Sequence, residues 1–278
     1  MLISGKKIAK EVFAQIKQEL EGEDQKPGLA VVLVGEDPAS KIYVSRKHKR
    51  AMSLGYHQET HLLSEDTPQE ELLTLIDRLN QDEKIHGILV QLPLPNHIDS
   101  SLVLKRIKPE KDVDGFHPYN AGLLSQGQGH LIPCTAKGIA VMLESLDIPL
   151  SGLHAVVIGR SNIVGRPVAQ LLEQHNCTVT LCHSRTQNLN DHLSRADIVV
   201  AAVGKANFVH GSALKEDCIV IDVGINRSEN GSLCGDVDFD SAREKAKAIT
   251  PVPGGVGPMT IAMLMKNTLE SWKRFHNH

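Results

Sequence analysis

The chain contains 278 residues, with 30 Lys and Arg against 33 Asp and Glu and a formal net charge of -3 at pH 7. This near balance excludes a strongly basic protein of the kind that attracts nucleic acid, so we expect small-molecule partners. Hydrophobic residues make up 41% of the chain and aromatic residues 3%. The core is therefore expected to be aliphatic, and the length favours two domains.

The cysteines and the opening residues indicate where the protein works. Five cysteines, at positions 134, 177, 182, 218 and 234, are odd in number and form no C-x-x-C pair, which favours a reducing compartment. The opening stretch MLISGKKIAKEVFAQIK carries charges every few residues, and the chain has no run of about 18 apolar residues. We therefore expect a cytoplasmic protein with no membrane segment.

The first half of the chain alternates between helical and strand patterns. Apolar residues at positions 8, 12, 13, 16 and 20 recur at helical spacing after Ser4 and predict an amphipathic helix. The run GLAVVLVG predicts a buried strand over residues 28–35. Further helices are expected at about 39–54 and 68–80, and further strands at about 56–63 and 87–92. Such alternation is typical of βαβ units around a parallel sheet.

A polar, glycine-rich interval from KPEKDVDGF to SQGQGHLIP separates this series from a second one. After a helix that begins at Cys134, strands are expected at 153–158, 178–182, 197–203 and 218–223, and helices at 165–175 and 239–247. The last segment, IAMLMKNTLESWKRF, has helical spacing and an apolar stripe that needs a partner surface. We expect two α/β domains with parallel sheets, and the final helix packed back on the first domain.

The stretch AVVIGRSNIVGRP joins a predicted strand to a predicted helix through two glycines. It matches neither the dinucleotide fingerprint nor the ATP-type loop, because Ser161 stands at the second glycine and no lysine follows the last. Backbone N–H groups and the helix dipole can still bind a phosphate in such a turn. The next strand ends at Ser184 and Arg185 without a carboxylate for a ribose hydroxyl, so Arg160 and Arg185 favour the 2′-phosphate of NADP. In the alternative, the glycines only form a tight turn and the arginines are solvated.

The segment SKIYVSRKHKR places Tyr43 and Lys47 four residues apart on one face of a helix. A Tyr-x-x-x-Lys pair is typical of short-chain dehydrogenases, but in that family the glycine loop precedes the pair, whereas here the pair comes first. The alternative is an ordinary basic helix surface, which we expect for the neighbouring lysines and arginines. Lys47 itself is a candidate proton donor and acceptor.

Two loops supply further candidates. Gln91 in VQLPLP ends a predicted parallel strand, where open α/β sheets bind ligands, or it only satisfies the strand end. Asp112 and Asp114 in KDVDGF either form a turn or present a carboxylate to the N–H groups of a ligand. No cysteine or carboxylate completes a zinc site around the histidines, so no metal is expected.

Seven motifs, in order along nearly the whole chain, make the sequence similar to the bifunctional methylenetetrahydrofolate dehydrogenase/methenyltetrahydrofolate cyclohydrolase family. They are S-K-I-Y-V-S-R-K-H-K, V-Q-L-P-L-P, K-D-V-D-G-F, I-P-C-T-A-K-G, V-I-G-R-S-N-I-V-G-R-P, C-H-S-R-T and P-V-P-G-G-V-G-P-M-T. The resemblance implies a homodimer whose subunits have a cleft between a folate-binding catalytic domain and a Rossmann-like NADP-binding domain. The catalytic domain would comprise residues 1–134 and 258–278, and the NADP-binding domain residues 135–257.

The resemblance also implies functional residues. Lys47 matches the family's essential lysine, and Gln91 matches the glutamine beside it. Tyr43 matches the tyrosine that stacks on the aminobenzoyl ring, and Asp114 the aspartate that binds the pterin. Further substrate contacts are implied for Leu92, Pro253, Gly254, Gly255, Val256 and Gly257. Cofactor contacts are implied for Gly159, Arg160, Ser161, Ser184, Arg185 and Ile225.

The activity implied by the resemblance has two steps. With NADP, 5,10-methylenetetrahydrofolate would be oxidised to 5,10-methenyltetrahydrofolate, which would then be hydrolysed to 10-formyltetrahydrofolate. These one-carbon units would supply purine, methionine and histidine synthesis. Two alternatives stay open: a non-catalytic NADP- or folate-binding regulator on the same scaffold, and an NADP-dependent dehydrogenase that acts on a different small molecule.

Overall fold

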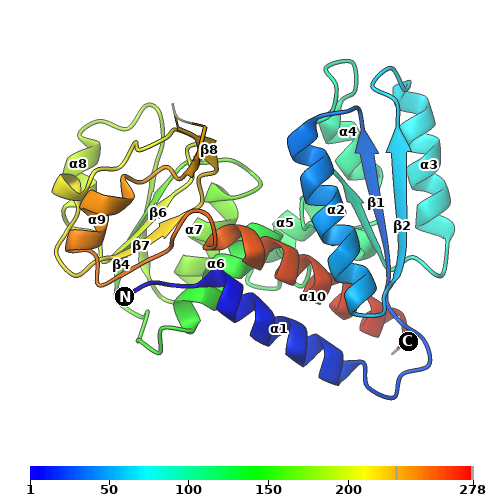
Figure 1. Cartoon of the computed structure of the whole chain (residues 1–278), viewed down its shortest axis with the longest axis horizontal. Coiled ribbons are helices and arrows are strands. Elements are labelled where there is room, and N and C mark those ends of the chain that lie inside the picture. Colours follow the sequence, from blue (N-terminus) through cyan, green and yellow to red (C-terminus); the bar gives the residue numbers. More distant parts are fainter. Residues whose placement is uncertain (229–230, 277–278) are drawn as a thin grey trace. The chain divides into compact units, whose positions relative to one another are not determined.

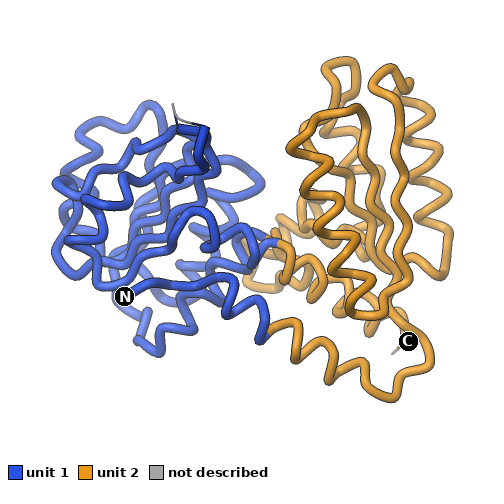
Figure 2. Tube along the Cα trace, viewed as in Figure 1, with its two compact units in different colours: residues 1–11, 135–260 blue, residues 12–134, 261–278 orange. Residues whose placement is uncertain are grey.

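The computed structural model describes residues 1–228 and 231–276, which form two compact units. One unit comprises Val12–Cys134 and Ile261–His278, and the other Met1–Glu11 and Thr135–Thr260 (Figure 2). We call them the three-stranded unit and the five-stranded unit, after their main sheets. The boundaries of the functional domains stay a prediction.

The sheet of the three-stranded unit is parallel, with strand order β2-β1-β3. The strands are β1 (Gly28–Val34), β2 (His57–Leu63) and β3 (Gly87–Val90). Every residue of the central strand β1 is buried, which fits its continuous apolar run, because helices cover both faces of a parallel sheet. Strand β2 is an edge strand with only partial burial.

Two helices join the strands of this sheet, and two further helices and a 3-10 turn follow β3 (Figure 1). They are α2 (Pro38–Ser53), α3 (Gln69–Gln81), α4 (Ser100–Arg106), the 3-10 turn η1 (Pro109–Lys111) and α5 (Pro118–Ser125). One aliphatic cluster unites alternate residues of β1 with buried residues of α3 and α4, including Val32, Ile76 and Val103. Burial of such side chains contributes about 1.5–3 kcal/mol each. This packed core fixes the positions of the strand ends, where polar side chains gather.

The final helix α10 (Val256–His276) packs on the three-stranded unit through its residues after 260. Tyr56 donates a hydrogen bond from its hydroxyl to the carbonyl of Met265 at 2.8 Å, and both groups are buried. The hydroxyl of Ser271 donates to the carbonyls of His86 and Glu110 at 2.5 and 2.7 Å. The expectation that the closing helix returns to the first domain is confirmed. The opening helix α1 (Gly5–Glu19) ends at Glu19, which forms ion pairs with lysines of α10.

The five-stranded unit has a parallel sheet of order β10-β7-β6-β4-β5. The strands are β4 (His154–Ile158), β5 (Thr178–Cys182), β6 (Ile198–Ala201), β7 (Ile219–Asp222) and β10 (Ala248–Ile249). Strands β5 and β6 flank β4 on opposite sides, so the order reverses there, and ligands bind at the carboxyl end of such a point.

The remaining elements of this unit connect or extend the sheet. They are α6 (Cys134–Glu144), α7 (Gly165–Gln174), α8 (Leu189–Leu193), the 3-10 turn η2 (Gly211–Ala213), α9 (Phe239–Lys245) and an antiparallel pair of β8 (Asn226–Arg227) and β9 (Leu233–Cys234). The expected fold class, two α/β units with parallel sheets, is confirmed. No described helix is both long enough and apolar enough to cross a membrane.

Candidate active site

Lys47 lies on the buried face of α2, which is unusual for a lysine. The helix begins after Asp37, whose carboxylate accepts a hydrogen bond from the N–H of Ser40 at 2.7 Å. Within this helix the buried residues recur at helical spacing and include Val44 and Ala51. Only 7% of Lys47 is exposed, so this lysine occupies a position of the helix where an apolar side chain would ordinarily pack.

The side chain of Gln91 accepts a hydrogen bond from the ammonium of Lys47. Nζ of Lys47 donates to Oε1 of Gln91 at 3.0 Å, and Nε2 of Gln91 donates to the carbonyl of Leu92 at 2.7 Å. The backbone N–H of Gln91 donates to the carbonyl of Val32 in β1 at 2.8 Å, which extends the sheet by one bond. These three bonds fix the amide with its oxygen toward the lysine. Gln91 is thus placed at the carboxyl end of β3, as predicted.

Tyr43 stands one helical turn before Lys47 and is half-buried. Burial raises the pKa of its phenol, against the opposing charge of Arg46. The phenol is therefore neutral near pH 7, and its ring is suited to stacking.

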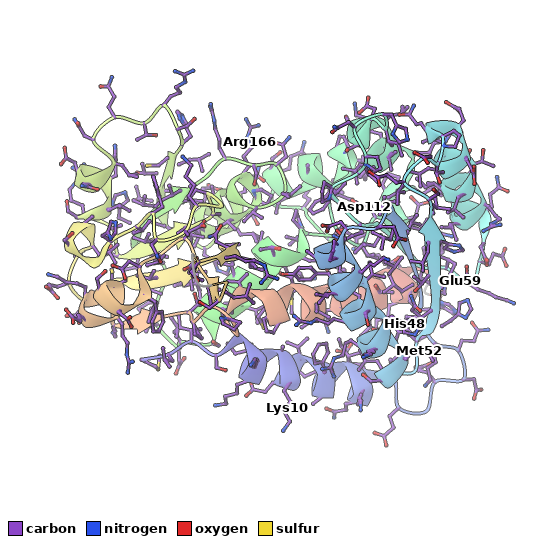
Figure 3. The ribbon with its side chains drawn as sticks, turned by 45° about the horizontal axis from the view of Figure 1, so that its top comes forward. Lys10, His48, Met52, Glu59, Asp112 and Arg166 are labelled. Atoms are coloured by element: carbon purple, nitrogen blue, oxygen red, sulfur yellow. The ribbon has the colours of Figure 1, made fainter. Side chains whose placement is uncertain are left out.

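The two aspartates of the KDVDGF motif have separate roles in the structure. Asp112 accepts hydrogen bonds from the N–H groups of Phe116 and His117 at 3.1 and 2.8 Å and from Nδ2 of Asn120 at 2.8 Å. It is 1% exposed and forms a bridge with Ile88 of β3 (Asp112 is labelled in Figure 3). The turn-forming alternative thus describes Asp112.

Asp114 is less deeply buried than Asp112, and its role as a carboxylate presented to a ligand stays a prediction. Burial raises its pKa to about 6, the charge of Lys47 lowers it, and Asp112 raises it further. The nearby Cys134 side chain also lowers the pKa of Asp114. Lys47, Gln91 and Asp114 therefore form one electrostatically connected group in the three-stranded unit.

Asn267 of α10 supports the Asp114 loop and was not predicted from the sequence. It is fully buried, and its Nδ2 donates to the carbonyls of Val113 and Ile132 at 2.9 Å each. The thiol of Cys134 also donates to the carbonyl of Val113, at 3.2 Å. An asparagine in an apolar helix stripe is a signal for such a role, because a buried amide needs partners.

The glycine loop follows β4 in the five-stranded unit. Gly159 has φ +116°, and a Cβ there would overlap the carbonyl oxygen of Ala202. A Cβ on Gly165 would overlap the carbonyl oxygen of Gly159 in turn. Both positions therefore require glycine, and the loop opens the N-terminus of α7 toward the carboxyl end of β4. A phosphate-bearing cofactor fits this turn.

The remaining cofactor candidates gather at the ends of β4 and β5. Arg160, Ser161, Ser184 and Arg185 are all exposed. The hydroxyl of Ser161 accepts from the N–H of Val164 at 3.2 Å, which fixes the loop before α7. Adjacent parallel strands bring both arginines to one edge of the sheet, where a ribose phosphate would lie.

Ile225 is 52% exposed and is held between two buried carboxylates that the sequence did not reveal. Asp222 accepts from the N–H groups of Gly224, Asp236 and Val237 at 2.9–3.0 Å. Asp236 accepts from the N–H groups of residues 203–205 at 2.6–3.0 Å and from Nδ2 of Asn226 at 2.9 Å. Burial raises the pKa of Asp222 to about 6.

The predicted substrate turn at residues 253–257 leads into α10, whose first two residues are Val256 and Gly257. Gly254 has φ +111°, and its carbonyl accepts from the N–H of Lys6 at 3.2 Å. Gly255 is buried against Thr250 and Pro251, and a Cβ on Gly5 would overlap the carbonyl oxygen of Gly255. The turn is therefore built by close backbone contacts that need glycine.

No group of three metal-binding side chains occurs in the part of the chain that the structure describes. His57 and His61 both lie within hydrogen-bond distance of the carboxylate of Glu59, at 3.3 and 3.0 Å.

Comparison with known families accounts for both units. Residues 3–114 match the family described as tetrahydrofolate dehydrogenase/cyclohydrolase, catalytic domain, and residues 133–276 match the NAD(P)-binding domain of the same family. The chain belongs to this family. The resemblance carried by the seven motifs is confirmed.

Relatives with the same organisation span the whole chain. A bifunctional protein FolD from Magnetococcus marinus is 57% identical over 280 residues, which cover 99% of this chain and 98% of the relative. The crystal structure of bifunctional FolD from Campylobacter jejuni has a TM-score of 0.96 at 46% identity and 99% coverage of both chains. The Trypanosoma brucei enzyme, complexed with NADP cofactor and inhibitor, has a TM-score of 0.95 at 39% identity, covering 100% of this chain and 99% of that one.

Family membership confirms the expected enzyme class, a tetrahydrofolate dehydrogenase and cyclohydrolase with a nicotinamide cofactor. The roles of individual residues, Lys47 included, stay predictions. The geometry brings Tyr43, Lys47, Gln91 and Asp114 into one unit and the cofactor candidates into the other.

Proposed function

We propose that this chain oxidises 5,10-methylenetetrahydrofolate with NADP and hydrolyses the product to 10-formyltetrahydrofolate, with Lys47 as the central catalytic residue. The observation that carries the proposal is the buried ammonium of Lys47 bonded to Gln91 and acting on Asp114. A buried lysine with one amide partner is costly for stability, and such groups gather at functional sites.

In the oxidative step the residues of the chain orient the reactants. Tyr43 would stack on the aminobenzoyl ring, and its neutral phenol suits that contact. Asp114 would accept hydrogen bonds from the N–H groups of the pterin, as charge-assisted bonds once it is ionised. Bound NADP+ supplies the acceptor for the hydride that leaves the methylene carbon. Orientation of this kind contributes a large part of the rate of two-substrate reactions.

In the hydrolytic step, water adds to the methenyl carbon and loses one proton, which gives a hydroxyl adduct. The bond from that carbon to N5 then breaks while N5 gains a proton, and the hydroxyl loses its proton to the solvent as the formyl C=O forms. Lys47 would activate the water and return the proton to the ring nitrogen. Gln91 would hold the amine in place, since its own amide is fixed by Leu92 and Val32. General acid–base catalysis of this type contributes roughly 100- to 10,000-fold.

The cofactor would be held by the loop at Gly159, Arg160 and Ser161, with Ser184 and Arg185 at the 2′-phosphate and Ile225 at the nicotinamide. Its fit rests on the glycine turn at the N-terminus of α7 and on two exposed arginines at adjacent strand ends. Leu92 and the turn Pro253, Gly254, Gly255, Val256 and Gly257 would line the folate. The folate-binding domain would comprise residues 1–134 and 258–278, and the NADP-binding domain residues 135–257.

A homodimer is part of the proposal. Edge strand β2 exposes Leu62, which is 69% exposed, and neighbouring α2 exposes Met52, which is 55% exposed and labelled in Figure 3. An uncovered edge beside exposed apolar side chains favours association of two copies. We also propose a cytoplasmic location, supported by five free cysteines, and a supply of one-carbon units to purine, methionine and histidine synthesis, supported by the family resemblance.

An absorbance assay with methylenetetrahydrofolate and NADP+ tests the proposed activity. We expect the absorbance of the reduced nucleotide to rise, and the absorbance of the methenyl product to fall afterwards as that product is hydrolysed. Binding of both ligands without turnover would instead support the regulator. Nucleotide reduction that ignores folate and needs another small molecule would support the other dehydrogenase.

A further inference from the structure

A second polar cavity lies in the three-stranded unit, apart from the residues proposed to bind folate. Its volume is about 850 Å³. It is lined by Gln25, Lys26, His57, Asn80, Gln81, Glu83, Lys84, His86, Lys108, Lys111, Phe275 and His276. None of these residues belongs to the proposed folate or nucleotide contacts. We call this cavity the basic cavity.

The basic cavity lies at the amino-terminal edge of the sheet. Lys26 precedes β1, His57 begins β2 and His86 precedes β3. Because the strands are parallel, Gln91 follows β3 at the opposite edge. Gln91 lies five positions after His86 in extended chain, so their Cα atoms are about 16 Å apart. An occupant of this cavity is therefore distinct from the proposed folate.

The charge of the cavity is predominantly positive. Four lysines line it, against one carboxylate, Glu83. Asp82 and Glu110 also act on Lys111 through their charges, so three acids oppose the four lysines at this edge. Among the described residues, none of the lining lysines forms an ion pair within 4 Å. The cavity therefore holds cations without direct counter-ions.

Two buried groups give the cavity a fixed wall. Lys111 is 3% exposed, and its Nζ donates to the carbonyls of Leu79 and Asp82 at 3.1 and 2.7 Å. His86 is 5% exposed, and its Nδ1 accepts from the N–H of Gly28 at 2.9 Å, so a neutral ring carries its proton on Nε2. Both side chains are thus held in place by the backbone before any ligand binds.

Two groups of this wall, His86 and Lys111, have lowered pKa values. The pKa of His86 is lowered to about 4, first by burial and then by the charges of His276, Lys111 and His57, with Asp82 opposing. The pKa of Lys111 is lowered by burial and by Lys108, against Asp82, Glu110 and Glu83. Cations that disfavour one another in this way are stabilised by an added anion.

We propose that the basic cavity binds a multivalent phosphate anion. Inorganic polyphosphate or the phosphate chain of a nucleotide offers the same chemistry, because lysine ammonium groups bind phosphate as point charges. A single phosphate would occupy a small part of 850 Å³, whereas a chain of phosphates can reach several lysines at once. The half-exposed ring of Phe275, within 5.6 Å of His86, offers a surface on which a nucleotide base can stack.

Isothermal titration calorimetry of the full chain with tripolyphosphate, in the absence of nucleotide, tests this site. We expect one binding event that weakens as salt concentration rises. Lys84→Ala/Lys108→Ala should raise the dissociation constant at least tenfold, and both lysines are exposed, so folding is preserved. The control Lys10→Ala/Lys17→Ala removes two exposed charges of α1 outside the cavity and should leave binding unchanged (Lys10 projects from α1 in Figure 3).

Three results would overturn the proposal: no binding by the wild type, equal weakening by the two double variants, or wild-type binding by Lys84→Ala/Lys108→Ala. Loss of binding only in Arg160→Ala/Arg185→Ala would place the anion at the cofactor loop and would overturn it too. ATP titrated in the same way identifies the source: tighter binding than tripolyphosphate supports a nucleotide, and equal binding supports the phosphate chain alone. None of these measurements uses turnover, so they stand apart from the proposed activity.

Discussion

Lys47 and Gln91 are joined by a hydrogen bond of 3.0 Å between Nζ and Oε1, although 44 residues separate them in the chain. The lysine comes from the buried face of α2, and the glutamine follows the last residue of β3. Each is held by its own element, so the pair is rigid before a ligand binds. The three-stranded unit carries this pair and the Asp114 loop, and the five-stranded unit carries the glycine turn.

Gln91→Ala should lower the cyclohydrolase kcat about 10- to 100-fold, because Lys47 loses the acceptor that orients its amine. The dissociation constant for NADP should change less than twofold, since the cofactor candidates belong to the other unit. Stopped-flow absorbance of methenyltetrahydrofolate measures the first quantity, and fluorescence titration the second. The control Gln126→Ala removes an exposed amide and should have no effect. Undiminished hydrolysis by Gln91→Ala would show that the amide has no orienting role.

Asp114→Asn should stabilise the protein without ligand at pH 8. The pKa of Asp114 rises from 3.8 to about 6 on folding, so the unfolded chain loses this proton first as the pH increases. The free energy of unfolding therefore falls between pH 3.8 and pH 6 and stays lower above it. Removing the carboxylate should recover about 1–3 kcal/mol at pH 8, and less at pH 5.

Urea denaturation at the two pH values measures this difference. The exposed Asp66→Asn is the matched control and should change stability by a few tenths of a kcal/mol at either pH. Folate affinity should fall in Asp114→Asn even as stability rises, because the amide is a weaker acceptor than a carboxylate. A variant that is less stable than the wild type at pH 8 would contradict the burial argument.

Gly159→Ala should abolish nucleotide binding or lower it more than tenfold. The backbone has φ +116°, and the added Cβ would overlap the carbonyl oxygen of Ala202, so the turn must move. Gly122→Ala is the matched control, because a Cβ there has open space and the residue lies in α5. Equilibrium titration with NADP on both variants tests this. Normal binding by Gly159→Ala would remove the glycine turn from the cofactor site.

Arg160→Ala/Arg185→Ala should raise the dissociation constant for NADP about 10- to 100-fold and that for NAD less than threefold. Charge-assisted hydrogen bonds contribute roughly 1.5–3 kcal/mol, and only NADP carries the 2′-phosphate that these arginines would bind. Arg243→Ala, an exposed arginine of α9, should bind both nucleotides as the wild type does. Equal weakening for the two nucleotides would mean that the arginines do not read the 2′-phosphate.

The apolar runs of β1 and β4 were predictable from the sequence, because a buried parallel strand is a continuous apolar segment. Helix α5 was not predicted, since it is short and lies in an interval rich in polar residues and glycine. Its start at Pro118 after the capping His117 carried a local signal. Strand β10 has only two residues and depends on pairing with distant β7, which no local pattern encodes.

The candidate catalytic residues were easier to predict from the sequence than the residues that hold their loops in place. Lys47, Gln91 and Asp114 stand in motifs whose spacing can be read directly, and the structure brings them together. Asn267 and Asp236 were missed because their partners are far away in the sequence. A buried amide or carboxylate acquires its role only when the fold brings backbone groups to it.

Lys47→Met tests the central claim most directly, because it removes the amine and keeps the length of the side chain. We expect loss of methenyltetrahydrofolate hydrolysis by at least 100-fold, with the dissociation constant for NADP unchanged. Lys49→Met, on the exposed face of the same helix, should hydrolyse the substrate at the wild-type rate. Hydrolysis by Lys47→Met at the wild-type rate would contradict the account.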